Sequence, residues 1–243
     1  MNSANKPSLH TVLTPQLLDL YEIKDSIVVI IDVFRATSTM ATALYNGAAK
    51  IIPVDSPEAC IEIGNATGGI TAGERDGKII PGLSYGNSPS EYPRSFIANK
   101  TLVITTTNGT KLLHMALRKG AKEIITGSFP NLKNVVEYLK AQNAPVILGC
   151  SGWKNRFNIE DTLFAGAVIE AIKDNFTIHC DSSFMANQLY NQHKNNLPAY
   201  IKTLTHWHRL ASYGLESDML YCVSSDVAPS LPIFKDGALV NGA

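Results

Sequence analysis

The sequence has few cysteines and no long apolar run, and each of these features excludes a class of protein. The four cysteines, Cys60, Cys150, Cys180 and Cys222, lie far apart and form no C-x-x-C pair. Such spacing argues against a disulfide framework or a zinc site and is typical of reduced thiols. No apolar stretch approaches the length of a membrane span, and the first residues, MNSANKPSLH, lack the charged-then-apolar order of a signal peptide. We therefore expect a cytoplasmic protein.

The sequence also lacks an excess of either charge. Lys and Arg together number 21, as do Asp and Glu. No overall field would attract nucleic acid or an anionic membrane, so we expect neither as a partner. Two phosphate-binding patterns are missing as well, because there is no G-x-x-x-x-G-K-[ST] loop and no G-x-G-x-x-G after a strand. A site for a small anion would have to be built from local groups.

Short apolar runs rich in β-branched residues are present, and they alternate with segments of helical period. The predicted strands are Ser26–Asp32, Lys50–Val54, Thr101–Thr105, Glu123–Thr126 and Pro145–Cys150. The predicted helices are Thr37–Asn46, Pro57–Asn65, Gly109–Arg118, Leu132–Gln142 and Ile159–Lys173. This alternation predicts an α/β fold of three layers, α/β/α, around a mainly parallel or mixed sheet.

Two regions depart from the alternation. Gly68–Pro93 is rich in Gly, Pro and Ser and predicts a long, ordered loop, a kind of segment that often carries function. From Ser182 onward the pattern is mostly helical, up to a short apolar piece at Leu231–Phe234. With 243 residues, of which 45% are hydrophobic, we expect a single domain over residues 1–243. If it divides into two lobes, the boundary would lie near residues 174–182.

Polar motifs follow the predicted strands at their carboxyl ends, where open parallel sheets bind ligands. They occupy residues 32–39 (DVFRATST), 105–110 (TTTNGT), 127–131 (GSFPN) and 150–161, and the loop adds 73–75 (GER) and 86–89 (GNSP). Their convergence on one edge of the sheet predicts the site.

Carboxylates in these motifs could bind a metal. Asp32 ends an apolar strand, where a carboxylate is costly unless it is paired, hydrogen-bonded or metal-bound. Mg²⁺ prefers oxygen ligands, so we assign it to Asp32 and Glu74, with Glu160 or Asp161 as a companion. Alternatively, Asp32 caps the following helix or pairs with Arg35. Whether it acts as ligand or nucleophile is left open. An aspartyl-phosphate mechanism would need another acid, because Phe34 stands at the position of its second aspartate.

Basic and hydroxyl side chains in the same motifs predict an anion pocket. Arg35 and Arg75 each offer a planar fork to phosphate oxygens, and we expect both to act in catalysis with the carboxylates. Two helix starts, each with free backbone N–H groups, and the loop at Asn87 would bind the substrate. The residues expected to do so are Thr37, Ser38, Thr39, Asn87, Ser88, Thr106, Thr107, Asn108, Gly109 and Thr110. Capped helix starts with solvated arginines are the structural alternative.

Two further patterns offer rival chemistry. Residues 150–156 (CSGWKNR) have the Cys-x5-Arg spacing of cysteine phosphatases, in which a thiolate attacks phosphorus without a metal. Against that, the stretch between Cys150 and Arg156 is bulky for a tight cradle, and a Cys at a strand end commonly only packs. The run His206-Trp207-His208 could suggest metal binding, but alternate residues of a helix point to different faces, so we interpret it as a solvated helix surface.

Taken together, these motifs resemble the 2-phosphosulfolactate phosphatase family. The matching stretches are IDVFRATST (31–39), AGERDG (72–77), YGNSPSEY (85–92), TTTNGT (105–110), GSFPN (127–131) and the CSGW…IEDTLFAG run (150–166). The resemblance implies a magnesium-dependent phosphatase that converts 2-phospho-3-sulfolactate, or a similar small anionic phosphate ester, to 3-sulfolactate and phosphate. That reaction is a step in coenzyme M biosynthesis. A Cys150-dependent phosphatase and a non-catalytic anion-binding domain are the alternatives, and a homo-oligomer is left open.

Overall fold

The computed structural model describes residues 6–242, whose strands form one mixed sheet of 11 strands in the order β5-β4-β6-β3-β11-β10-β7-β2-β8-β1-β9. The strands are β1 Ser8–Val12, β2 Ile27–Ile31, β3 Lys50–Val54, β4 Ile70–Arg75, β5 Lys78–Ile79, β6 Thr101–Thr105, β7 Glu123–Gly127, β8 Val146–Cys150, β9 Thr177–Ile178, β10 Pro232–Lys235 and β11 Ala238–Asn241. The predicted α/β fold with a mixed sheet is confirmed.

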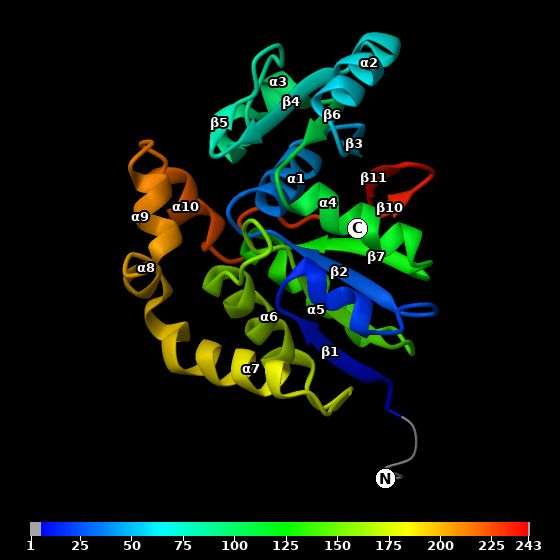
Figure 1. The fold of residues 1–243 in the computed structure, drawn as a ribbon, viewed down its shortest axis with the longest axis vertical. Helices are drawn as coiled ribbons and strands as arrows, with labels where there is room; N and C mark the ends of the chain where they lie inside the picture. The colour runs from blue at the N-terminus through cyan, green and yellow to red at the C-terminus, as the bar shows by residue number, and fades with distance from the viewer. Residues whose placement is uncertain (1–5, 243) are drawn as a thin grey trace.

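Apart from β5, which pairs antiparallel with β4 at one edge, the sheet consists of two parallel halves joined by an antiparallel hairpin. The strands β7, β2, β8, β1 and β9 are parallel, as are β4, β6 and β3. The hairpin β10–β11 lies between them and contacts each half at a single register pair, Ile233 with Ile125 and Leu239 with Ile51. The halves can therefore diverge at the carboxyl ends of their strands, and Figure 1 shows β3, β4 and β6 set apart from β2 and β7.

Helices cover both faces of the sheet. Side chains of β2 alternate between two cores, with Ile27, Val29 and Ile31 in one and Val28 and Ile30 in the other. Helices α5 and α6 pack into the first core, and α1 and α4 pack into the second. The α-helices are α1 Ala36–Tyr45, α2 Pro57–Thr67, α3 Arg94–Ile97, α4 Gly109–Arg118, α5 Leu132–Lys140, α6 Ile159–Ile172, α7 Asp181–His193, α8 Leu197–Ile201, α9 Thr205–Ala211 and α10 Glu216–Cys222. Short 3₁₀ turns are η1 Pro15–Leu20, η2 Pro89–Glu91, η3 Phe129–Asn131 and η4 Lys194–Asn196.

The helices α8, α9 and α10, which we call the arm, run along one side of the molecule from α7 toward β5 (Figure 1). Their apolar side chains, including Ile201, Trp207 and Met219, are buried in the same core as α5 and α6. At the far end, the ammonium nitrogen of Lys78 lies 5.5 Å from the ring centre of Tyr213. The arm therefore spans from one half of the sheet to the other.

Two sequence expectations about the fold need correction. The predicted loop Gly68–Pro93 contains β4, which pairs with β6, and β5. Strand β4 was missed because its central residues, Ala72 and Gly73, are small and give no apolar signal. Small residues are needed there because the backbones of β4 and β6 approach closely: a Cβ at Gly73 would lie 2.6 Å from the carbonyl oxygen of Thr105. Strand β1, which lies between β8 and the edge strand β9, has only two buried apolar residues, Leu9 and Val12, and was not predicted.

The C-terminal part is helical as expected, and the predicted apolar piece at its end forms β10. The possible lobe boundary near residues 174–182 stays a prediction; that stretch contains β9, and the discontinuity of the sheet lies at β10–β11. Within residues 6–242, none of the helices combines the length and apolar character of a membrane span.

Candidate active site

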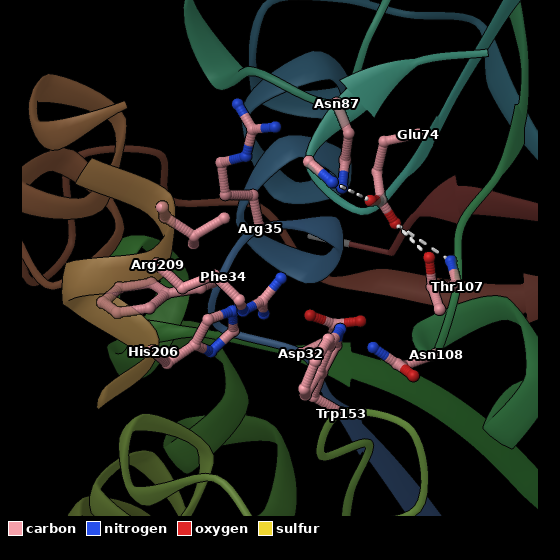
Figure 2. A pocket seen from close by; sticks show the side chains of 12 residues that line it. Asp32, Phe34, Arg35, Glu74, Asn87, Thr107, Asn108, Trp153, His206 and Arg209 are labelled. Carbon is pink, nitrogen blue, oxygen red and sulfur yellow. Dashed lines mark hydrogen bonds between the residues drawn. The ribbon is translucent and has the colours of Figure 1, made fainter. Parts of the chain in front are cut away.

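A pocket lies where strand-end loops from both halves of the sheet meet the arm. Figure 2 shows side chains from the loops after β2, β6 and β8, from β4 and from α9 meeting there. The lining residues are Asp32, Phe34, Arg35, Glu74, Gly77, Asn87, Thr107, Asn108, Trp153, His206, Arg209 and Leu210. This is the edge of the sheet at which the sequence predicts a ligand site.

Asp32 is buried at the end of β2, with a relative exposure of 6%. Burial and the nearby charge of Glu74 raise its pKa to about 7, although His206 and a hydrogen bond from Ser151 act in the opposite direction. The carboxylate lies against the start of α4, because a Cβ at Gly109 would be only 2.9 Å from Oδ2. A cation or a proton would therefore be favoured at this carboxylate.

The hydroxyl residues after Asp32 stabilise its loop and do not line the pocket. The Thr37 hydroxyl donates to the Asp32 carbonyl (2.9 Å) and accepts from its amide (3.1 Å), and the Thr37 amide also donates to that carbonyl. Ser38 donates to the carbonyl of Val33, and Thr39 to that of Asn87. The expected substrate contacts of Thr37, Ser38 and Thr39 are thus corrected, because none of the three lines the pocket and the amides of Thr37 and Thr39 already donate to the carbonyls of Asp32 and Arg35.

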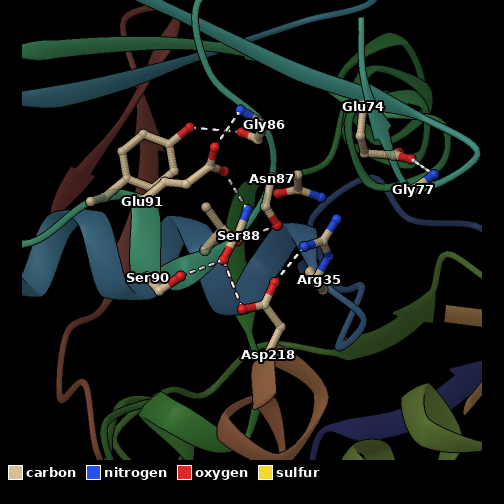
Figure 3. A network of polar contacts seen from close by, with 11 residues as sticks. Arg35, Glu74, Gly77, Gly86, Asn87, Ser88, Ser90, Glu91 and Asp218 are labelled. Atoms are coloured by element: carbon tan, nitrogen blue, oxygen red, sulfur yellow. Dashed lines mark hydrogen bonds and ion pairs between the residues drawn. The ribbon is translucent and has the colours of Figure 1, made fainter. Parts of the chain in front are cut away.

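Arg35 pairs with Asp218 of α10, and not with Asp32 as one alternative proposed. Both side chains are buried, at 5% and 8% exposure. The Ser88 hydroxyl donates to the other oxygen of Asp218 at 2.7 Å, so loop, helix and arm meet in one network (Figure 3). Arg35 still lines the pocket, and one edge of its guanidinium is fixed by the carboxylate.

Glu74 lines the pocket from β4 and is held by three hydrogen bonds. Its Oε1 accepts from the amide and hydroxyl of Thr107 at 3.0 and 2.9 Å, and its Oε2 accepts from the amide of Gly77 at 2.9 Å. Asn87 lies nearby, is 3% exposed, and has an Oδ1 with no hydrogen-bond partner among the described residues. Glu74, Asn87 and Thr107 are therefore placed as the sequence predicts, on one pocket.

The TTTNGT motif divides between two environments. Thr107 and Asn108 line the pocket, and Gly109 lies directly beside Asp32. Thr106 and Thr110 bond to each other, with their amides and hydroxyls 3.3 Å apart in both directions. These two residues line a neighbouring hollow instead.

Arg75 faces that neighbouring hollow, together with Lys111 and His114, and does not line the pocket of Asp32. Its guanidinium donates to the Glu74 carbonyl at 2.8 Å and to the Thr105 hydroxyl at 3.2 Å. Successive residues of a strand point to opposite faces, so Glu74 and Arg75 cannot both face one pocket. The expectation that Arg35 and Arg75 act together on one anion is therefore corrected, because the two side chains face different spaces.

Glu160 and Asp161 begin α6 and lie behind the pocket wall, not on it. Asp161 accepts from the amide of Val33 at 2.9 Å and from that of Gly152 at 3.1 Å, and it ties the two loops together. Its pKa is raised well above the usual range by burial and by its neighbours Glu160 and Asp32. Glu160 contacts Nδ1 of His206, and its Oε2 has no hydrogen-bond partner within the described part of the chain.

The donors that remain for a metal are Asp32 and Glu74. They share one pocket, and the charge of Glu74 raises the pKa of Asp32, so a cation between them would relieve their repulsion. In residues 6–242, no three His, Cys, Asp or Glu side chains are arranged to hold a metal ion. Two carboxylates fit Mg²⁺, because it usually keeps several waters and binds through one or two carboxylates plus phosphate oxygens.

Sequence reasoning missed the residues that the arm contributes. The interpretation of 206–208 as a solvated surface was wrong for His206, which lines the pocket, and for Trp207, which is 7% exposed, whereas His208 is exposed as expected. His206, Arg209 and Leu210 all line the pocket from one face of α9. Their spacing of i, i+3 and i+4 is the signal that could have identified this face.

His206 has a defined orientation. Its Nδ1 contacts the Glu160 carboxylate, and this contact fixes the orientation of the ring. Glu160 lies behind the wall, which leaves Nε2 for the pocket. The edge of the ring packs near Phe34, with centroids 5.8 Å apart.

Cys150 is not placed as a nucleophile. It is fully buried in the core below the sheet edge, and burial with the charges of Asp161 and Glu160 raises its pKa well above the usual range. Arg156 does not complete a loop of amides around it, because its backbone pairs with Trp153 in a tight turn. A thiolate is disfavoured at such a position.

The fold and pocket together define an α/β protein with a polar pocket at the carboxyl ends of its strands, which is where folds of this kind bind small molecules. The family model described as 2-phosphosulpholactate phosphatase matches residues 12–237. The chain belongs to this family.

Several relatives carry the same printed name, "Probable 2-phosphosulfolactate phosphatase". The protein from Thermotoga maritima is 40% identical over 214 residues, covering 88% of this chain and 89% of the relative. The one from Caldanaerobacter subterraneus subsp. tengcongensis is 35% identical over 233 residues, covering 94% and 96%. The one from Clostridium tetani is 36% identical over 221 residues, covering 90% and 93%. Similarity therefore extends over nearly the whole chain.

Proposed function

We propose that the protein is a magnesium-dependent phosphatase that hydrolyses 2-phospho-3-sulfolactate to 3-sulfolactate and phosphate. Membership of the family and the names of the relatives support this phosphoric monoester hydrolase activity. The observation that carries the proposal is the pocket itself, in which two carboxylates and two guanidinium groups face one small space. The link to coenzyme M biosynthesis, the cytoplasmic location and a homo-oligomer stay predictions.

Asp32 and Glu74 would hold Mg²⁺, and the ion, when bound, supplies positive charge to the phosphoryl oxygens. Arg35 would add a fixed guanidinium, since Asp218 holds one of its edges and the other is left for a phosphoryl oxygen. Asn87 and Thr107 offer neutral polar groups beside Glu74. Charge that develops on the phosphoryl group would thus meet donors that are already oriented.

His206 would transfer a proton during the reaction. Water attacks phosphorus, the bond from phosphorus to the ester oxygen breaks, and the departing alkoxide takes a proton from Nε2 of His206. The attacking water gives one proton to the phosphate product or the solvent, and Nε2 of His206 regains a proton from the solvent before the next turnover. Glu160 at Nδ1 would stabilise the charged imidazole before the transfer.

Phosphate release from 2-phosphosulfolactate tests the proposal. Protein treated with a chelator should lose activity and regain it when Mg²⁺ is added. Full activity in chelator, abolished by thiol alkylation, would favour a Cys150 phosphatase instead. No phosphate release with any divalent metal, alongside binding of 3-sulfolactate measured by calorimetry, would favour a non-catalytic anion-binding domain.

A further inference from the structure

Arg209 is a cation in the pocket that forms no ion pair within residues 6–242, although the charges of Asp76, Glu160 and Glu74 act on it from a greater distance. It projects from the face of α9 that also carries His206 and Leu210 (Figure 2). Among the ion pairs formed by residues 6–242, none involves Arg209. Burial lowers its pKa from the usual value, which reflects the cost of removing the charge from water. Arg35, by contrast, already has a partner in Asp218.

An aromatic ring holds Arg209 in place. The centre of its guanidinium lies 4.0 Å from the ring centre of Trp153. Stacking of this kind uses the face of the guanidinium plane and leaves the N–H groups at its edge available. The fork can therefore accept a planar or tetrahedral anion without losing the contact that orients it.

Trp153 is itself held by a tight turn after β8. Its amide donates to the carbonyl of Arg156 at 2.8 Å, and the amide of Arg156 donates back at 2.9 Å. The two central residues, Lys154 and Asn155, have φ values of 49° and 62°, as a type I′ turn requires. The amide of Lys154 also donates to Oδ1 of Asn108 at 3.3 Å. The stacking platform is thus fixed to the same loops that form the pocket.

Arg209 also lies at the junction of two spaces. Trp153, His206 and Arg209 line both the pocket of Asp32 and an adjoining hollow that extends to Phe157 and Thr205. Asp32 and Glu74 line only the first of these two. A substrate with its phosphoryl group at the carboxylates would extend past Arg209 toward the second space.

We propose that Arg209, stacked on Trp153, binds the anionic group of the substrate that is not transferred, either the sulfonate or the carboxylate. The inference rests on the proposed function and assigns the specificity of that site. Arg209 would select phosphate esters that carry a second negative charge, whereas Asp32, Glu74 and Arg35 serve the phosphoryl group. Trp153 is a positioning residue for this contact.

Steady-state kinetics on two esters test the assignment. Phenyl phosphate carries only the phosphoryl group, and 2-phosphosulfolactate carries two further anions. We expect Arg209→Gln to lower kcat/KM for 2-phosphosulfolactate by about 30-fold, mainly through KM, because a charge-assisted contact is lost. The loss on phenyl phosphate should be at least about tenfold smaller. Equal losses on the two esters, or no loss on either, would overturn the proposal.

Matched variants distinguish this role of Arg209 from a general effect of its charge and from an effect of its packing. Arg118→Gln removes the same charge at the exposed end of α4, about 15 Å along the helix from its start, and should change neither ester's kinetics. Arg209→Lys should recover only part of the loss, because an ammonium lacks the planar fork. Trp153→Leu should raise KM for 2-phosphosulfolactate, and combining it with Arg209→Gln should add little further. Fully additive losses would show that Trp153 does not act through Arg209.

A third ester identifies the group that Arg209 contacts. 2-Phospholactate keeps the carboxylate and has a methyl group in place of the sulfomethyl group. A full loss with Arg209→Gln on this ester assigns the carboxylate, and a small loss assigns the sulfonate. A wild type that does not hydrolyse 2-phosphosulfolactate would overturn the proposed function and this inference with it. An active wild type with an unaffected Arg209→Gln variant would overturn the inference alone.

Discussion

The two walls of the pocket are built differently. On the strand-end wall, formed by the loops that carry Asp32, Glu74 and Thr107, the Asp32 backbone is fixed by the Thr37 hydroxyl of its own turn. The Glu74 carboxylate is held by the amide of Gly77 in its own hairpin and by Thr107 of the neighbouring loop. On the arm, each functional side chain is held by contacts to residues that lie outside the arm. These contacts join His206 to Glu160, Arg209 to Trp153 and Asp218 to Arg35.

Because of this difference, we expect substitutions on the two walls to have different effects on activity and stability. Substitution of Asp32 removes a proposed reacting group and leaves its turn intact, because the bonds between the Asp32 backbone and Thr37 do not use the Asp32 side chain. A substitution on the arm breaks the contact between the walls, and so changes stability and activity together. Three variants, taken from the largest expected effect on activity to the smallest, test whether the two walls behave in this way.

Asp32→Ala should cause the largest loss of activity. We expect kcat/KM for 2-phosphosulfolactate to fall by about 1,000-fold or more, because a proposed metal ligand is removed. The melting temperature should not fall, since the change removes a buried carboxylate whose pKa is raised by burial and by Glu74. Steady-state kinetics and thermal unfolding check both points. Near-normal turnover would contradict the assignment of catalysis to the strand-end wall.

Asp218→Ala should affect both properties. It leaves the buried Arg35 without its partner, and breaking a buried ion pair in this way costs about 3 kcal/mol in the free energy of unfolding. The activity should fall by about tenfold, because the guanidinium loses its fixed orientation. Denaturant unfolding and kinetics measure the two effects.

The matched control for Asp218→Ala is Glu216→Ala, which removes an exposed carboxylate from the first turn of the same helix. It should cost less than about 1 kcal/mol in the free energy of unfolding. If Asp218→Ala lowered activity but not stability, the arm would not couple the two properties as the comparison requires.

Cys150→Ser should have the smallest effect on activity. Cys150 lies under the strand-end wall, in the core, and does not line the pocket. We expect kcat/KM within about twofold of the wild type and a loss of about 1 kcal/mol in stability, because a hydroxyl replaces a thiol in apolar surroundings. An inactive but folded variant would instead restore the thiolate mechanism.

Much of the strand-end wall was predictable, because the strands that position it can be recognised from short stretches of sequence. Apolar runs such as Ile27–Ile31 define parallel strands, and the carboxyl ends of parallel strands share an edge, so Asp32 and Asn108 could be brought together from the sequence alone. Glu74 was assigned to the same site from the motif of its loop, without its strand being predicted. What the pattern could not decide is which way a side chain turns. Thr37 belongs to a correctly predicted motif, yet its hydroxyl bonds to its own loop.

The helical character of the arm was predicted, but its contribution to the pocket was not, because that contribution depends on contacts between distant parts of the chain. His206 meets Glu160 and Asp218 meets Arg35 across 46 and 183 residues of sequence. Nothing in the local pattern of a seven-residue helix such as α9 tells which side of the molecule it covers. Only the spacing of His206, Arg209 and Leu210 indicates a shared face, and it does not name the neighbour of that face.

The hairpin β10–β11 has a consequence for how the chain is made. Strands β3 and β7 are complete by residue 127, but the hairpin that lies between them is formed by residues 232–241. At ribosomal speeds of about 5–20 residues per second, the two halves would wait on the order of 5 to 20 seconds with those strand edges unpaired. Unpaired edges recruit strands from other chains. The nascent chain, more than the finished protein, is therefore the form that is exposed to aggregation.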